Sequence, residues 1–412
     1  MTSVPPATRW MDADPSGADD AVAGDGTVRE GHAGEGTRRV LFLKLGSFSG
    51  TNARLVDALQ RECPDLEVEA LDVRVELRRR KAALAGLVGA SLLEHGLPGR
   101  IGWSGAGGPA LRSRLRRDFY RSKGVFDAVR RLSRSRGERT RYAFTLQTQS
   151  LFDGSLAGIP HFVYTDHAAL APPPGQDGPP PSEAWLARER EIYDNATHVF
   201  TFGPHVRDVI VDRYDIPDHK VSAVASGVQA TVAAAADTRP ERYRGRRILF
   251  VGRAWERKGG PDLLAAFRIV RGAVPDAQLV IVGTAAPAEE AGVTVTGILP
   301  PGEVAAQFRK ASLFCLPSRL EPFGIVVAEA MHHGLPVVAA RVGDIPSMVD
   351  DGVNGILVPP RSPEALAGAL VRMLTDPDAS ARFAREGLRR AERYTWDGVA
   401  GRMARHFPRA AG

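Results

Sequence analysis

Short apolar runs of strand length alternate with stretches of helical periodicity along most of the 412-residue chain, and this alternation constrains the fold more than any other feature. Strands that alternate with helices form parallel sheets that are covered by helices on both faces. The alternation falls into two series, because residues 229–244 show neither pattern and contain an alanine run. We therefore predict an α/β protein with two doubly wound, Rossmann-like domains that face each other across a cleft.

The two predicted domains span residues 38–228 and 245–390, with 229–244 as the linker between them. We expect residues 391–412 to form a C-terminal helix that packs back toward the first domain. In open α/β sheets, ligands bind outside the carboxyl ends of the strands, so two facing domains suit an enzyme with two substrates. The predicted strands, in chain order, are 39–45, 66–73, 142–147, 161–165, 197–202, 220–225, 247–251, 278–282, 293–296, 313–316, 336–340 and 355–358.

Charge is distributed unevenly along the chain. Residues 1–36 contain two arginines against seven acidic residues and show no periodicity, so we predict a disordered acidic tail over 1–37. Residues 74–141 contain eighteen Lys and Arg against five acidic residues. Three interpretations of this basic segment remain: a solvated face of helices, a surface that docks on an anionic membrane, or a surface that attracts an acidic acceptor. Nucleic acid is not expected as a partner, because no aromatic interleaving accompanies the charge.

Three further features bear on where the protein works. The longest apolar stretch, Ala82–Leu93, has twelve residues, fewer than the ~18–20 that span a bilayer. The N-terminus opens hydrophilic and lacks the apolar core of a signal peptide. The chain has two cysteines, Cys63 and Cys315, which fits a reducing compartment. We expect a cytoplasmic protein whose membrane contact, if the basic segment makes one, is peripheral and on the inner face.

A glycine and two basic residues follow the first predicted strand of the second domain. Gly252 and Arg253 come directly after the strand, and Lys258 follows five residues later. Glycine lets the backbone approach a ligand closely. Arg and Lys beyond one strand end can converge on a single anion such as a diphosphate. The alternative interpretation is a solvated basic turn.

Two glutamates flank the start of a predicted buried helix that ends at Gly334. Glu321 lies in the loop before the helix, and Glu329 lies within it. The N–H groups of a helix N-terminus suit phosphate oxygens, and separated carboxylates suit the hydroxyl groups of a sugar. The alternative interpretation makes Glu329 a residue of the helix surface.

The segment from Glu321 to Glu329 has the form E-x-F-G-x-x-x-x-E and resembles the signature of the family-4-type retaining glycosyltransferases of the GT-B fold. The resemblance runs from about residue 38 to 410 and includes the basic pair after the strand. It also includes residues 330–339 and 351–358 and the closing Tyr394-Thr395-Trp396. It implies a transferase that moves a hexosyl-type sugar from a nucleoside diphosphate sugar to an acceptor hydroxyl of a glycolipid, glycan or secondary metabolite.

The resemblance places the donor nucleotide sugar on the second domain and requires neither a metal nor another cofactor. It implies that Arg253 and Lys258 hold the diphosphate and stabilise the leaving group. Glu321 is implied to contact the hydroxyls of the donor sugar, and Glu329 the hydroxyls of the ribose. Further donor contacts are implied for Thr296, Gly297, Phe323, Gly324 and Ile325.

The resemblance places the acceptor on the first domain and assigns two positions there. Gly50, which ends the loop after the first strand, is implied to approach the diphosphate from the side opposite the second domain. His167 matches a histidine that faces the reaction centre in the family, although a structural loop histidine is the alternative. The neighbouring Asp166 could act as a base, orient His167 or do neither. The proline-rich segment 171–181 is predicted to border the acceptor site.

Two positions depart from the family pattern. Where the family has Gly-Gly-x-Pro-Glu, this chain has Gly-Asp-Ile-Pro-Ser, with Asp344 at a glycine position and Ser347 at the glutamate position. We expect the departure to affect how the donor is handled. The first-domain loop reads Gly-Ser-Phe-Ser-Gly rather than the commoner paired glycines, and the ring of Phe48 either enters the cleft or packs under the loop.

Neither Asp-x-Asp pattern in the chain lies in a context that suits a catalytic metal. The first, at Asp12 and Asp14, falls in the acidic tail, and the second, at Asp376 and Asp378, falls in a loop after a late helix. Two alternatives to the transferase remain, a nucleotide-sugar 2-epimerase and a degenerate module that binds nucleotide sugar or membrane without turnover. The spacing of Glu321 and Glu329 argues against the first alternative.

Overall fold

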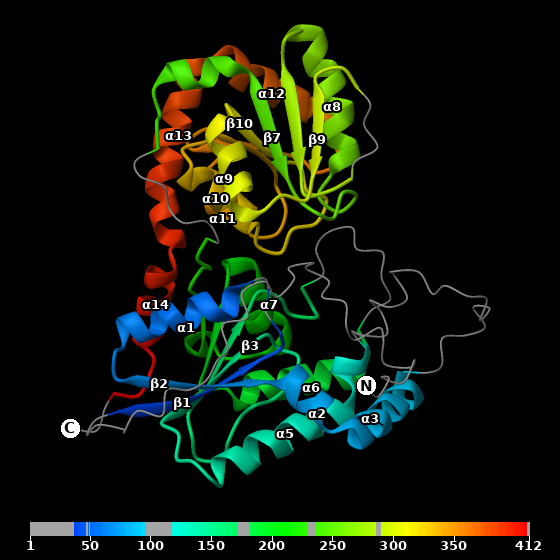
Figure 1. Ribbon diagram of the computed structural model, residues 1–412, viewed down its shortest axis with the longest axis vertical. Helices are drawn as coiled ribbons and strands as arrows, with labels where there is room; N and C mark the ends of the chain where they lie inside the picture. Colours follow the sequence, from blue (N-terminus) through cyan, green and yellow to red (C-terminus); the bar gives the residue numbers. More distant parts are fainter. Residues whose placement is uncertain are drawn as a thin grey trace.

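The computed structural model describes residues 37–95 except 47 and 49, 118–171, 181–228, 236–285 and 290–409. These residues form two six-stranded parallel sheets, one below and one above in the view, with helices on the faces of each (Figure 1). The predicted fold class is confirmed. Every predicted strand is present, with its ends shifted by at most two residues. Within the described part of the chain, no helix is long and apolar enough to cross a membrane.

The first sheet has the order β2-β1-β3-β4-β5-β6. Its strands are β1 (Arg38–Lys44), β2 (Leu66–Asp72), β3 (Phe144–Thr148), β4 (His161–Thr165), β5 (His198–Thr201) and β6 (Val221–Ala223). Its helices are α1 (Thr51–Glu62), α2 (Val73–Arg79), α3 (Lys81–His95), α5 (Lys123–Gly137), α6 (Glu183–Asn195) and α7 (Pro204–Tyr214). The chain leaves β1 to form β2 on one side and later returns to form β3 on the other, so the topological switch point lies between β1 and β3.

The second sheet has the order β12-β11-β10-β7-β8-β9. Its strands are β7 (Arg247–Val251), β8 (Gln278–Val282), β9 (Val293–Gly297), β10 (Leu313–Leu316), β11 (Val337–Ala340) and β12 (Gly355–Val358). The helices of this half are α8 (Gly260–Ala273), α9 (Pro301–Lys310), α10 (Ile325–His332), α11 (Ile345–Met348), α12 (Pro363–Thr375), α13 (Pro377–Ala391) and α14 (Trp396–Ala404). The switch point here lies between β7 and β10, the two strands that precede the predicted donor loops.

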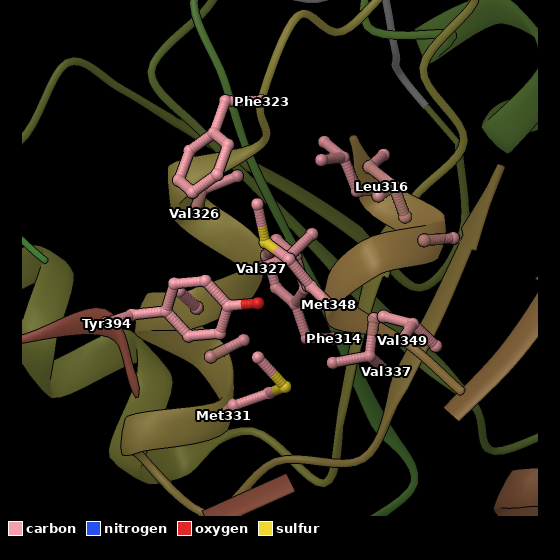
Figure 2. Packing of buried hydrophobic residues seen from close by; sticks show 14 of the residues in the cluster. Phe314, Leu316, Phe323, Val326, Val327, Met331, Val337, Met348, Val349 and Tyr394 are labelled. Atoms are coloured by element: carbon pink, nitrogen blue, oxygen red, sulfur yellow. The ribbon is translucent and has the colours of Figure 1, made fainter. Parts of the chain in front are cut away.

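Continuous apolar strands form the core because a parallel sheet is covered on both faces. Every residue of β3, β4, β10 and β11 is buried. Around α10, Val327 and Met331 pack with Phe314 of β10 and Val337 of β11 (Figure 2). A helix that is apolar on nearly all sides is stable only in such a position, and this position holds the N-terminus of α10 at the edge where the strands end.

The C-terminal helix α14 returns to the first domain and packs beside α1 (Figure 1). Its first residue, Trp396, is 8% exposed and donates an indole N–H to the carbonyl oxygen of Val228 at 3.0 Å. On the surface, Arg61 of α1 pairs with Asp397 of α14 at 2.6 Å. The first domain is therefore completed by a segment from the end of the chain.

Trp396→Ala should destabilise the fold by about 3–5 kcal/mol, because it removes a buried aromatic side chain and leaves a cavity between α14 and the first domain. Trp396→Phe is the matched control, since it keeps a ring and loses the hydrogen bond to Val228, at a cost of about 1 kcal/mol. Urea denaturation measures both values. Equal stability of the two variants would contradict this account of how α14 is held.

Candidate functional site

The loops that follow β7 and β10 meet at the switch point of the second sheet. Backbone N–H groups of Arg319 and Leu320 both donate to the carbonyl oxygen of Arg257, at 2.9 and 3.3 Å. Gly259 has φ of +74°, and a Cβ there would lie under 3.0 Å from the carbonyl oxygen of Pro317. Glycine is therefore required at 259 both for the backbone conformation and for the close approach of the two loops.

A buried ion pair joins the two loops. Lys258 Nζ lies 2.8 Å from Glu321 Oε2, and the two side chains are 13% and 9% exposed. The Ser318 hydroxyl donates to the same carboxylate oxygen at 3.3 Å, and an Arg257 nitrogen lies 3.6 Å from it. Burial alone would raise the pKa of Glu321, but the charges of Lys258 and Arg257 and the hydrogen bonds outweigh it and lower the pKa. Glu321 is thus held as a carboxylate beside two cations.

The geometry around Gly252 brings Lys258 to the end of β7. A Cβ at Gly252 would lie under 3.0 Å from Cδ of Lys258, so the lysine stem passes directly over this glycine. Arg253 is the next residue and is exposed. The predicted pair therefore lies on one loop, with Lys258 paired to Glu321 and Arg253 open to solvent.

Helix α10 begins beside this ion pair. Its N-cap is Gly324, with φ of +91° and no side-chain cap, and Ile325 is its first residue. The first N–H groups of a helix have no intrahelical partner, and they carry its positive dipole end. Glu329 is half-buried on the same helix. The sheet thus places a cationic loop and a helix N-terminus at the same edge.

The remaining predicted donor residues lie at two other points. Thr296 and Gly297 end β9, where the Thr296 hydroxyl donates to the carbonyl oxygen of Ile281 at 3.3 Å. Phe323 is buried and meets Phe202 of the first domain in an edge-to-face contact with centroids 5.5 Å apart. The loop of Glu321 therefore touches the first domain directly through Phe323.

His167 and Asp166 follow β4 at the carboxyl edge of the first sheet. The backbone N–H of His167 donates to the Thr165 hydroxyl at 3.2 Å. Burial, together with the charges of Arg121 and His205, lowers the pKa of His167 to about 4, so its imidazole is neutral near pH 7. Burial and the negative charge of Glu321 raise the pKa of Asp166 to about 6. Asp166 of the first domain therefore lies within the electrostatic influence of Glu321 of the second domain.

Gly50 caps α1 in a left-handed conformation with φ of +76°. The loop before it is anchored by Asn52, whose amide donates to the carbonyl oxygen of Gly46 at 2.8 Å. Phe48 packs against Phe202 with ring centroids 5.8 Å apart. We predicted that the ring of Phe48 either enters the cleft or packs under its loop. The structure shows this ring packed on Phe202, which also contacts Phe323 where the two domains meet.

Two predictions concern segments away from this edge. Asp376 is the N-cap of α13 and accepts a hydrogen bond from the backbone N–H of Ala379 at 2.8 Å, so its carboxylate has a structural role. Over the residues that the structure covers, no group of three or more His, Cys, Asp or Glu could hold a metal ion. Asp12, Asp14 and most of the proline-rich segment, 172–180, lie outside the described residues.

The described parts of the basic segment 74–141 are mostly helical, and most of them belong to α2, α3 and α5. Several of their charges are paired, including Arg130 with Asp153 at 2.5 Å and Arg136 with Glu69 at 2.7 Å. Such pairing shows that part of the charge of this segment is used in ion pairs within the protein. The interpretations as a membrane surface and as an acceptor surface stay predictions, and residues 96–117 lie outside the described part.

Two contacts of the site were not predicted from the sequence. Asp344 was identified only as a departure from the family pattern, whereas the structure shows its carboxylate bonded to the backbone N–H of His205 in the first domain at 2.7 Å. The seam of Phe48, Phe202 and Phe323 also joins distant segments. The only sequence signal for the first contact was the aspartate at a position where relatives have glycine.

Comparisons with known proteins agree with this geometry. The family described as glycosyl transferases group 1 matches residues 245–376, and the one described as family 4 glycosyltransferase in conflict systems matches 140–295. The D-inositol 3-phosphate glycosyltransferase of Frankia alni is 31% identical over 284 residues, which cover 61% of this chain and 69% of that protein. The corresponding protein of Corynebacterium glutamicum is 30% identical over 252 residues, 55% of this chain and 60% of its own length.

Solved structures show the same architecture. Anabaena HepE in complex with UDP and glucose aligns with a TM-score of 0.59 and 18% identity, covering 89% of this chain and 98% of that chain. Sucrose-phosphate synthase from Thermosynechococcus elongatus aligns with a TM-score of 0.56 and 20% identity over the same shares. The chain belongs to the family-4 glycosyltransferases, in which two Rossmann-like domains form the GT-B fold.

Glu321→Gln should lower stability at pH 7 by about 1–3 kcal/mol, because it removes the negative partner of buried Lys258. The pKa of Glu321 is lowered in the folded state, so its stabilisation is present above the unfolded value of about 4.3 and is lost as pH falls through the folded value. The difference from wild type should therefore shrink below about pH 4.

Urea denaturation at pH 7 and at about pH 3.5 measures this difference. Glu256→Gln is the matched control, since Glu256 lies on the same loop but is 74% exposed. It should change stability by less than about 0.5 kcal/mol at both pH values. A difference for Glu321→Gln that is independent of pH would contradict the ion-pair assignment.

Proposed function

We propose that this protein transfers a hexosyl-type sugar from a nucleoside diphosphate sugar to an acceptor hydroxyl, with retention of configuration and without a metal. The observation that carries the proposal is the placement of Arg253 and Lys258 on the loop after β7 and of the N-terminus of α10 after β10, at the switch point of the second sheet. This edge is where open α/β sheets bind nucleotides. Structural neighbours crystallised with UDP and with UDP-glucose support a nucleotide sugar as donor.

In this proposal the positive groups act on the diphosphate. Arg253, which is exposed, supplies a planar guanidinium, and Lys258 supplies a compact ammonium group. As the glycosidic bond breaks, negative charge develops on the departing phosphate, and preorganised cations stabilise it most in the transition state. These charges and the helix N-terminus fill the role that a metal has in other nucleotide-sugar enzymes, which is why we propose metal independence.

The carboxylates and the histidine would orient the sugar. Glu321 is held ionised beside Lys258 and can accept hydrogen bonds from donor hydroxyls. Glu329, further along α10, would bind the ribose hydroxyls. His167 is neutral near pH 7 and would serve as a hydrogen-bonding group facing the reaction centre from the first domain. For retention, the incoming hydroxyl attacks on the face that the phosphate leaves, and a phosphate oxygen accepts its proton.

The acceptor would bind to the first domain near His167. The relatives named as D-inositol 3-phosphate glycosyltransferases make a phosphorylated polyol the first acceptor to test. The matched segments span between 37% and 69% of the length of the first three of these relatives. Inositol phosphates, glycerol lipids and simple sugars should therefore be compared side by side.

Arg253→Ala and Lys258→Ala should each lower turnover by about 10²–10³-fold, as other losses of transition-state charge stabilisation do. Arg372→Ala, on an exposed part of α12, removes the same charge elsewhere and should leave turnover unchanged. The measurement is steady-state release of the nucleoside diphosphate. Wild-type rates in either site variant would refute the assignment of the diphosphate to this loop.

Nucleotide binding can be tested without knowing the acceptor. A nucleoside diphosphate at 100 times its Kd should stabilise the protein by about 2.7 kcal/mol. Thermal unfolding with UDP, GDP, ADP and TDP should show a rise in Tm for one base, and EDTA should not remove it. A rise that EDTA abolishes would overturn metal independence, and no rise for any base would undercut the donor site and favour the degenerate module without turnover.

A further inference from the structure

We infer that Asp344 is a positioning residue for the transfer reaction. Its carboxylate, on the second domain, caps helix α7 of the first domain. This contact fixes the position of the loop that carries Glu321 relative to the first domain. The inference rests on the proposed function for its effect on turnover, but the capping contact itself does not. It gives a role to the aspartate that stands at a glycine position of the family pattern.

The carboxylate occupies the position of a helix cap. Helix α7 begins at Pro204, and its N-cap, Gly203, makes no side-chain cap hydrogen bond. The first N–H groups of a helix lack intrahelical partners and are usually satisfied by a nearby Ser, Thr, Asp or Asn. Proline has no N–H, so the first one in α7 belongs to His205, and Asp344 Oδ1 accepts from it at 2.7 Å. The side chain of the N-cap residue usually accepts this hydrogen bond. In α7 the acceptor is instead a carboxyl group of the other domain.

Gly203 makes room for this cap. A Cβ at this position would lie under 3.0 Å from the carboxyl group of Asp344. Its backbone is extended, with φ of −145° and ψ of 172°, which any residue can adopt. The position therefore requires a small residue because of the space that Asp344 fills, and not because of backbone strain. The absence of a side chain at Gly203 thus matches the carboxyl group of Asp344 from the other domain.

The cap is connected to the donor loop through the backbone. The N–H of Asp344 donates to the carbonyl oxygen of Pro322 at 3.1 Å, next to Glu321. The hydroxyl of Ser347 donates to the carbonyl oxygen of Asp344 at 2.8 Å. Ser347 is the second departure from the family pattern, so the two departures are bonded to each other. Movement of Asp344 would therefore be transmitted to the loop that carries Glu321.

The same point of the first domain also contacts the donor loop through an aromatic pair. Phe202 immediately precedes Gly203 and packs edge-to-face on Phe323, with centroids 5.5 Å apart. The polar cap, at His205, and the aromatic contact, at Phe202, thus lie three residues apart along the first domain. Phe323 contacts the first domain directly, and Pro322 is hydrogen-bonded to Asp344, so both contacts hold the segment between Glu321 and Gly324 near the start of α7.

The burial of the carboxyl group shows that this contact is not incidental packing. Asp344 is 1% exposed, and its Oδ2 has no hydrogen-bond partner among the described residues. The groups that interact with it are the backbone N–H of His205 and the carboxylate of Asp208, both on α7, and Tyr394 in the turn after α13. Burial and the charge of Asp208 raise its pKa to about 7. Burying a carboxyl group costs free energy. Among the described residues, the hydrogen bond from the backbone N–H of His205 to Asp344 Oδ1 offsets part of this cost.

Amide hydrogen exchange of His205 tests the cap without requiring turnover. Asp344→Ala should accelerate this exchange about tenfold, the loss expected for a helix cap. Gly203→Ala should do the same from the other domain by displacing the carboxylate, and the double variant should be no worse than Asp344→Ala alone. Asp344→Asn keeps an acceptor oxygen and should restore the protection. Asp212→Ala, at an exposed position further along the same helix, is the control and should leave His205 exchange unchanged.

Turnover and UDP affinity then test the positioning role. In Asp344→Ala and Gly203→Ala, kcat should fall about tenfold while the Kd for UDP changes less than about twofold, and Asp344→Asn should recover most of kcat. Unchanged His205 exchange in Asp344→Ala would overturn the cap. A loss of UDP affinity as large as the loss of kcat would overturn positioning in favour of direct donor contact. Absence of turnover in the wild type, with His205 exchange as expected, would refute the proposed function and leave the cap standing.

Discussion

All strands of both sheets run parallel, and this constraint decides where everything else in the molecule lies. Parallel strands bring their carboxyl ends to one edge, and the loops that follow them are the places where polar side chains can gather without burying unsatisfied backbone. The strand order of the second sheet sets β7 beside β10, so Lys258 and Glu321 meet although 63 residues separate them. The strand order therefore decides which loops meet at the site, and the side chains of those loops decide its chemistry.

The ion pair of Lys258 and Glu321 sets the electrostatics of this edge. Burying either charge alone would cost free energy, and pairing each with the other offsets part of that cost. Arg253 adds an exposed cation on the same loop, and α10 adds its N-terminus. On our proposal, a diphosphate would meet positive charge that is already in place, which costs no reorganisation when the bond breaks.

The two domains are tied together at separate points along the chain. Helix α14 packs on α1 and is fixed by the indole of Trp396. Near the site, Phe323 packs on Phe202, and Asp344 caps α7. The described contacts near the site are small and include the hydrogen bond from His205 to Asp344, whereas the contact of α14 is a packed helix pair. We infer that α14 secures the assembly and that the contacts at the site adjust its geometry.

The sequence alone determined the fold class and every strand to within two residues, because periodicity and turn chemistry are local properties. It also singled out the motif residues of the loops after β7 and β10. It also marked Asp344 as unusual. It could not show that Lys258 and Glu321 pair, that Phe48 packs on Phe202, or that Asp344 reaches His205, which lies 139 residues away. Those contacts join segments from different strands or different domains, so only the tertiary packing of the two sheets decides which atoms come within hydrogen-bonding distance.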